Sequence, residues 1–273
     1  MENLEEGLIR IVEQEQPTTV RHVFYKAVAE GLIPKTEEAY KGVVVRLLTR
    51  LRRAGAIPYG YISDNTRWTL AVRSYGSTSE AVADFARDYR RNLWTNADVR
   101  VEIWTEKDAV AGLLSDAAIQ WCVPTMVFRG YSSISYLYTL AEEIKSRGLP
   151  TYIYYFGDWD PSGLNIEKVV TKTVREMAPA AEIHVERLAV TSEQIEEYGL
   201  PTRPTKKTDS RSKKFRGRSV EVDALDSATL QALAESAIRS HLDDEEVERL
   251  LLVEKQEKRT LAAFAGKLRR KAS

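Results

Sequence analysis

The chain has 273 residues with 40 basic and 40 acidic side chains, so its formal net charge is zero. It has no long apolar run and only one cysteine, Cys122, which excludes an integral membrane protein and a disulfide within the chain. A zinc site built from cysteines is excluded for the same reason. We expect a cytoplasmic protein of two domains that does not associate with a membrane.

The N-terminal part of the chain is expected to be helical. Apolar residues recur at helical spacing over 4–15, a second helix is predicted over 20–30, and a third helix is predicted to end at Gly55. Short apolar stretches at 57–62 and 68–72 predict a β-hairpin after these helices. Three helices followed by a hairpin are typical of a winged helix, whose third helix enters the major groove of DNA.

Basic side chains are concentrated in two stretches of the chain. One is the third predicted helix, where arginines recur at helical spacing on one face, and the other is the segment 203–218. Such local basic blocks suit the phosphate backbone of DNA, although a single basic run is more often a solvated surface. The residues that we expect to contact double-stranded DNA from these stretches are Lys41, Arg46, Arg50, Arg53, Lys213 and Lys214.

The rest of the chain alternates between apolar strands and amphipathic helices, which predicts an α/β fold with a parallel sheet covered by helices on both faces. We expect a DNA-binding unit at 1–77, a connecting helix within 78–97 and an α/β domain with C-terminal helices at 98–273. The predicted elements are a connecting helix at 79–94, strands at 99–105, 123–128, 151–156 and 183–189, and helices at 107–120, 132–147, 163–177, 227–240 and 243–270. A capping box at Thr191 is expected to open one more helix.

Acidic residues follow two of the predicted strands. Glu106 ends the strand at 99–105, and Asp158 and Asp160 follow the strand at 151–156. Ligands of open α/β sheets bind at the carboxyl ends of the strands, so we expect these three carboxylates to converge. If the strand continued through Asp158 and Asp160, both would point to the same side. An all-oxygen site of this kind suits Mg²⁺, with Mn²⁺ as an alternative, and Glu221 and Asp223 are weaker candidates.

Three further residues lie beside these acids or upstream of them. Arg21 and Tyr25 are four residues apart on the second predicted helix and therefore share a face. Taken alone, a tyrosine in such a place is a packing residue. Lys107 follows the metal-site glutamate, where it either contacts phosphate or balances Asp108.

These motifs together resemble a known family. The run TEKDAV at 105–110 followed by GDWDPSG at 157–163 resembles a Toprim domain, the metal-binding module of topoisomerases, bacterial primases and several nucleases. The run RHVFY at 21–25 lies upstream, in a predicted winged helix, and has the Arg-x-x-aromatic-Tyr pattern. With it, the chain resembles the topoisomerase VI A subunit and its meiotic double-strand-break relatives, especially the short stand-alone "mini-A" proteins of bacteria and phages.

The resemblance implies a type IIB topoisomerase A-like enzyme that cleaves DNA. In that family the tyrosine aligned with Tyr25 attacks DNA, so Tyr25, Arg21 and Glu106 become catalytic candidates, and Glu106, Asp158 and Asp160 the Mg²⁺ ligands. The family acts as a homodimer in which the tyrosine of one protomer works with the metal site of the other. It also implies association with the nucleoid, contact of Lys107 with DNA and, for strand passage, a separate GHKL-type ATPase subunit.

Two other functions remain open from the sequence. A Toprim nuclease would hydrolyse DNA with metal-activated water and leave Tyr25 a structural residue. A non-catalytic DNA-binding protein would need neither a metal ion nor a nucleophilic tyrosine, although the intact carboxylates argue against this function. Arg21, one helical turn before Tyr25, favours the tyrosine-dependent reaction.

Overall fold

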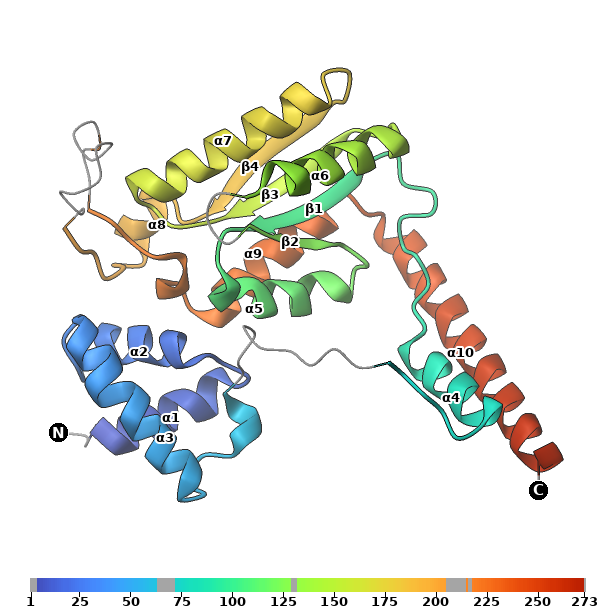
Figure 1. Cartoon of the computed structure of the whole chain (residues 1–273), viewed down its shortest axis with the longest axis horizontal. Helices are drawn as coiled ribbons and strands as arrows, with labels where there is room; N and C mark the ends of the chain where they lie inside the picture. Colours follow the sequence, from blue (N-terminus) through green and yellow to red (C-terminus); the bar gives the residue numbers. More distant parts are fainter. Residues whose placement is uncertain (1–3, 63–71, 129–131, 205–214, 216–217, 273) are drawn as a thin grey trace.

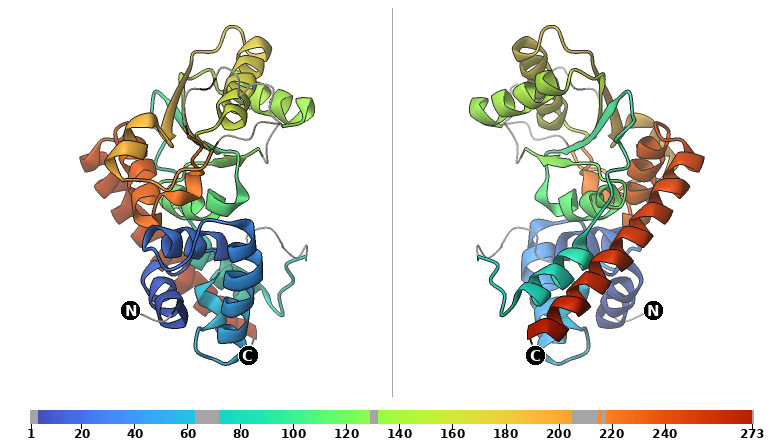
Figure 2. Two further views of the ribbon diagram at one scale, coloured as in Figure 1. Left: turned by 90° about the vertical axis from the view of Figure 1, so that its left-hand side faces the viewer. Right: turned by 90° about the vertical axis from the view of Figure 1, so that its right-hand side faces the viewer.

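The structure is a computed structural model that describes residues 4–62, 72–128, 132–204, 215 and 218–272. Figure 1 shows an N-terminal helical unit, an α/β domain, and a pair of helices that extends away from both. The views in Figure 2 show the C-terminal helix running along one side of the molecule.

The α/β domain contains a four-stranded parallel sheet. Its strands are β1 (Arg100–Thr105), β2 (Thr125–Val127), β3 (Thr151–Phe156) and β4 (Ile183–Ala189). The strand order is β2-β1-β3-β4, and all three pairings are parallel. The predicted parallel α/β fold is confirmed, and β3 and β4 have the predicted bounds.

The path of the chain creates a switch point between β1 and β3. From β1 the chain passes through α5 (Asp108–Ile119) to β2 on one side, then returns through α6 (Ile134–Arg147) to β3 on the other side. Ligands of open α/β sheets bind outside the strand ends at such a point. The carboxyl ends of β1 and β3 are therefore the place where a site is expected.

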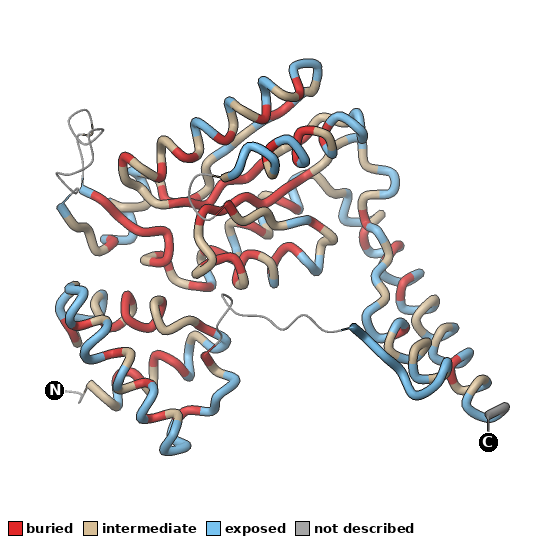
Figure 3. The backbone as a smooth tube through the Cα atoms, in the orientation of Figure 1, coloured by how far each residue is buried: buried red, intermediate tan, exposed pale blue. Residues whose placement is uncertain are grey.

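Helices cover both faces of the sheet, as Figure 1 shows. Helices α5 and α9 (Ser227–Arg239) pack on the face that carries Val101 and Ile103 of β1. Helices α6 and α7 (Pro161–Met177) pack on the opposite face, which carries Trp104 of β1. Alternate residues of each strand thus enter separate cores, and Figure 3 shows the strands as the main buried part of the domain.

The N-terminal unit has its own apolar core, with Leu8, Val23 and Leu48 among its buried residues. The first two predicted helices are confirmed as α1 (Leu4–Glu15) and α2 (Val20–Ala29). The third predicted helix begins as a π-helical segment, η1 (Ala39–Val44), and continues as α3 (Val45–Arg53). As predicted, glycines with positive φ follow the helices, namely Gly31 at 73° and Gly55 at 76°.

The predicted hairpin after α3 is not seen in the described residues. Its first strand is replaced by a 3-10 turn, η2 (Tyr59–Tyr61), and Ile62 makes a single parallel bridge with Thr18. The second predicted strand falls largely on 63–71, outside the described residues. The chain between Pro58 and Ile62 turns back toward the start of α2, because Thr18 N donates to the Tyr61 carbonyl.

The connecting helix is shorter than predicted. Helix α4 (Thr78–Asp88) ends six residues before the predicted end at Trp94, because Tyr89 leaves the helical conformation with ψ of 131°. The Tyr89 hydroxyl donates to Glu257 of α10 (Asp244–Ala272) at 2.8 Å. Figure 1 shows α4 packed along the second half of α10, so the C-terminal helix returns to the connecting segment.

The remaining elements agree closely with the sequence. Helix α8 (Ser192–Glu197) begins with the predicted capping box between Thr191 and Gln194. A 3-10 turn, η4 (Val222–Ala224), precedes α9. Within the ranges that the structure describes, no helix combines the length and the apolar composition that crossing a membrane requires.

Candidate functional site

Glu106 lies at the carboxyl end of β1 and faces the end of β3. Its Oε1 accepts a hydrogen bond from the Asp158 backbone N–H at 2.8 Å, and its side chain is buried, with 7% of the residue exposed. Burial raises the pKa of Glu106 to about 7, and the charge of Asp158 adds to this effect. The ends of the two central strands are thus joined by a carboxylate that gains or loses its proton near neutral pH.

Two glycines allow this close approach. A Cβ on Gly163 would lie 2.4 Å from the Asp158 carbonyl oxygen and 3.0 Å from Glu106 Oε1. A Cβ on Gly157 would lie 2.5 Å from the ring of Tyr155 and 3.3 Å from Glu106 Oε1. Glycine is therefore required at both positions by close neighbours rather than by backbone conformation: the Asp158 carbonyl oxygen at Gly163 and the Tyr155 ring at Gly157, with Glu106 Oε1 also near both.

The two aspartates of this run have different partners. Asp158 Oδ1 accepts from the Val222 backbone N–H at 2.9 Å, and burial raises the pKa of Asp158. Asp160 Oδ1 accepts from the Gly163 backbone N–H at 2.8 Å and caps α7. The condition under which both carboxylates would point to one side is not met, because β3 ends at Phe156, before either of them.

Lys107 stands at the centre of a group of carboxylates. Its Nζ lies 2.9 Å from Asp158, 3.2 Å from Glu221 and 3.2 Å from Asp223. Burial alone would lower the pKa of Lys107, but these three negative charges raise it above its ordinary value. Lys107 is therefore a charged, half-buried side chain that links β1 to the segment before α9.

The N-terminal unit brings Arg21 and Tyr25 to two of the carboxylates that surround Lys107, namely Glu221 and Asp223. Arg21 Nε lies 3.6 Å from Glu221 and 3.5 Å from Asp223. The Tyr25 hydroxyl interacts with the Glu221 carboxylate as a hydrogen-bond donor, and only 3% of Tyr25 is exposed. Burial raises the pKa of Tyr25, and the charges of Asp223 and Glu221 raise it further, so the phenol is held in its neutral form.

Sequence reasoning underestimated Glu221 and Asp223. Both are almost completely buried, and each pairs with Arg21 and with Lys107. Arg203 adds a further ion pair, with Nη1 2.5 Å from Glu221. The signal was present in the run VEVDAL at 220–225, where acids alternate with apolar residues that enter the core.

Neither the models of protein families nor the curated proteins match this chain.

The three predicted metal ligands do not form a preformed metal-binding site within the described residues. Of the residues that the structure describes, no three His, Cys, Asp or Glu side chains are placed to hold a metal ion. Glu106 and Asp158 adjoin each other, however, with Asp160 two residues further along. They offer only oxygen ligands, and Mg²⁺ is commonly held by one or two carboxylates together with water. The donors therefore fit Mg²⁺ or Mn²⁺ in chemical type.

The predicted DNA-binding residues on the third helix form an exposed surface. Lys41, Arg46, Arg50 and Arg53 are all exposed, on η1 and α3. Lys41 Nζ pairs with Glu37 at 2.8 Å, and Arg50 pairs with Glu5. Lys213 and Lys214 lie outside the described residues.

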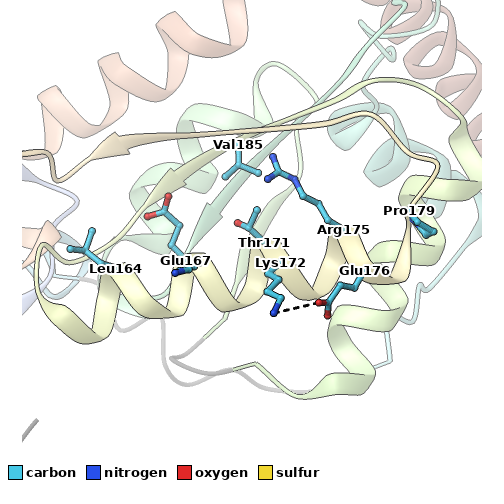
Figure 4. Close-up of a pocket in the computed structure, with 9 residues that line it drawn as sticks. Leu164, Glu167, Thr171, Lys172, Arg175, Glu176, Pro179 and Val185 are labelled. Carbon is cyan, nitrogen blue, oxygen red and sulfur yellow. Dashed lines mark ion pairs between the residues drawn. The ribbon is translucent and has the colours of Figure 1, made fainter. Parts of the chain in front are cut away.

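A hollow beside α7 is separate from this site. Figure 4 shows it between α7 and β4, with Lys172 and Glu176 paired at its margin, 3.6 Å apart. None of the predicted site residues lines it. One lining residue, Glu167, supports the site indirectly, because it pairs at 2.6 Å with Arg187, whose Nη1 donates to the Gly157 carbonyl at 2.9 Å.

Proposed function

We propose that this chain is a DNA-cleaving enzyme of the topoisomerase VI A type, with a winged-helix unit followed by a Toprim domain. The observation that carries the proposal is that Tyr25 and Arg21 contact Glu221 and Asp223. Lys107 joins these two acids to Asp158 at the end of β3. A tyrosine, an arginine and a carboxylate site are the groups that a tyrosine-mediated phosphodiester transfer requires. They come from parts of the chain that are far apart in sequence.

In this reaction the Tyr25 oxygen would form a bond to phosphorus while the bond between phosphorus and the 3′-oxygen breaks. The phenolic proton leaves, the 3′-oxygen takes up a proton, and the product is a 5′-phosphotyrosyl linkage. A phenol with an ordinary pKa near ~10 needs help to react at neutral pH. Arg21 is in place to stabilise charge on the phosphate. Against the effect of burial, Lys107, the Tyr25 hydroxyl and two arginines lower the pKa of Glu221 to about 2, so the phenolic proton would pass to water rather than stay on Glu221.

The carboxylates Glu106, Asp158 and Asp160 would hold Mg²⁺ or Mn²⁺. When bound there, the ion would neutralise negative charge on the scissile or a neighbouring phosphate. Glu106 must lose its proton before it can serve as a metal ligand. Burial raises its pKa, and a bound cation would lower that pKa again.

The proposed active unit is a homodimer on double-stranded DNA. In this single chain Tyr25 faces the carboxylates of its own α/β domain. We propose that in the dimer Tyr25 of each protomer makes these contacts with the carboxylates of its partner instead. Strand passage would need a separate GHKL-type ATPase subunit, and the proposed location is the nucleoid in the cytoplasm.

A second candidate is a Toprim nuclease that uses metal-activated water. The burial of Tyr25 and the raised pKa of its hydroxyl favour this candidate, because both make the phenol a poorer nucleophile. A non-catalytic DNA-binding protein is a third candidate, in which Lys107 takes the place of a metal among the carboxylates.

One experiment separates the three candidates. End-labelled duplex DNA is incubated with the protein and Mg²⁺ or Mn²⁺, denatured, and analysed for a protein–DNA adduct. An adduct that the parent forms and Tyr25→Phe does not form supports the proposal. Cleavage without an adduct identifies a nuclease. No cleavage in either metal, with and without a GHKL-type ATPase, identifies a binding protein.

A further inference from the structure

Four cationic side chains surround Tyr25 and the acids beside it, and they differ in their partners. Arg21, Lys107 and Arg203 each form an ion pair with Glu221. Lys35 is the fourth, and within the described parts of the chain it forms no ion pair with a carboxylate. Its positive charge is therefore the least neutralised of the group.

Lys35 lies in the loop before η1 and contacts the segment after α8. Its Nζ donates to the Pro201 carbonyl oxygen at 2.6 Å and lies 5.0 Å from the centroid of the Tyr25 ring. The ammonium group thus rests over the ring of the proposed nucleophile. A neutral carbonyl is a weaker partner for an ammonium group than a phosphate oxygen, which forms a charge-assisted hydrogen bond.

We propose that Lys35 contacts the phosphodiester with which Tyr25 reacts, and that a phosphate oxygen replaces the Pro201 carbonyl as its partner. This inference rests on the proposed function, because it requires DNA at Tyr25. It assigns a catalytic contact to a residue that lies ten positions after the tyrosine, in the loop before η1. Lys107 would then balance the buried carboxylates, while Lys35 adds its positive charge to that of Arg21 at the phosphate.

The protonation of Lys35 agrees with such a role. Burial lowers the pKa of Lys35 to about 8; Glu221 and Asp223 oppose this shift, and the nearby charges of Arg203 and Lys107 add to it. Without DNA, a large fraction of Lys35 is therefore neutral at pH 8. A phosphate beside the amine would raise this pKa again, so DNA binding and protonation of Lys35 favour each other.

The test uses Tyr25→Phe as the background, so that binding is measured without covalent chemistry. Lys35→Gln, added to this background, is expected to weaken binding of a short duplex about tenfold and to lower the salt slope by about one unit. Lys35→Arg keeps the charge and is expected to bind within about threefold of the background protein. Lys26→Gln is the matched control, since Lys26 is paired with Glu15 at 2.9 Å and its loss should change binding by less than about twofold.

A second measurement uses the parent protein. Mild acetylation at pH 8 followed by peptide mass mapping is expected to modify Lys35, because a large fraction of its amine is neutral at this pH. Duplex DNA is expected to slow the modification of Lys35 severalfold and to leave Lys26 unaffected. This measurement decides the question even if Lys35→Gln fails to fold.

The outcomes separate this inference from the proposed function. If DNA leaves the modification of Lys35 unchanged, or if a folded Lys35→Gln variant binds with the slope of its background, the phosphate contact is wrong. If Lys35 is protected but Tyr25→Phe still cleaves DNA, the covalent reaction is wrong and the phosphate contact stands.

Discussion

The Nε of Arg21 lies 3.5 Å from Oδ2 of Asp223, which joins the second helix of the chain to the segment before α9. The same nitrogen lies 3.6 Å from Glu221. Both acids are buried, so the arginine compensates charge that water cannot reach. The N-terminal unit and the α/β domain therefore share one site, and the predictions below test what that site does.

The first prediction concerns the Tyr25 hydroxyl. Tyr25→Phe keeps the ring and its packing, so the free energy of unfolding should fall by only about 1–2 kcal/mol through loss of the contact with Glu221. The protein–DNA adduct should disappear, while DNA binding persists. Tyr40→Phe is the matched control, because Tyr40 packs on Phe24 in the same unit and its hydroxyl has no role in the proposal. An adduct that survives in Tyr25→Phe would rule out this residue as the nucleophile.

The second prediction concerns the carboxylates at the strand ends. Glu106→Gln and Asp158→Asn preserve side-chain shape but remove the charge, so cleavage in Mg²⁺ should fall at least about a hundredfold. The rise in Tm that Mg²⁺ produces in the parent should also be lost. Glu186→Gln changes an exposed residue of β4 and should retain both cleavage and the rise in Tm with Mg²⁺. Parental cleavage in both site variants would remove the case for a metal site here.

The third prediction concerns the exposed basic surface on α3. Arg46→Ala together with Arg53→Ala should weaken duplex binding and lower its salt slope by about two units, if each arginine contacts one phosphate. Arg50 is left unchanged because it is paired with Glu5. Binding is measured by fluorescence anisotropy over a range of salt concentrations.

The control for this surface lies on α7. Lys168→Ala together with Lys172→Ala removes the same charge from exposed positions of another helix. The control is expected to keep the parental salt slope. An equal loss of binding and salt slope in the two double variants would mean that binding depends on the total charge of the protein rather than on the arginines of α3.

The fourth prediction concerns Gly163. Gly163→Ala forces a Cβ to within 2.4 Å of the Asp158 carbonyl oxygen, so we expect a loss of about 1–3 kcal/mol in the free energy of unfolding. Gly266→Ala, in α10, has no atom within 4 Å of the added Cβ and should stabilise the protein by up to about 1 kcal/mol. Urea unfolding measures both, and a Gly163→Ala variant as stable as the parent would contradict the packing described around Glu106.

The fifth prediction concerns the pH dependence of stability. A hydrogen bond from His22, acting against burial, and the interaction with Lys26 lower the pKa of Glu15 from 4.5 to about 2. Because the folded pKa is below the unfolded one, this stabilisation is complete above about pH 4.5 and is lost as the pH falls toward 2. Glu15→Gln should cost about 1–2 kcal/mol at pH 7, after allowance for solvent screening, and should flatten the loss of stability in acid. An unchanged acid profile would exclude Glu15 as its source.

Much of the fold could be predicted because its signals are local. The apolar run of β3 lies between Pro150 and Gly157, and β4 begins after Glu182 and ends shortly before the capping residue Thr191, which determines the strand bounds closely. The capping box at Thr191 and the helix-ending Gly55 depend only on neighbouring residues. The end of α4 was missed because it depends on contacts with α10, more than a hundred residues later in the chain.

By itself the sequence determined a parallel α/β sheet and the presence of acids at two strand ends. Only the tertiary structure decided the partners of these acids: Glu106 joins the Asp158 backbone, and Lys107 joins Asp158, Glu221 and Asp223. It also decided that Tyr25 is buried against the acids of its own chain. The physical reason is that hydrophobic periodicity and capping act over a few residues, whereas ion pairs and pKa values depend on distances that the whole path of the chain sets.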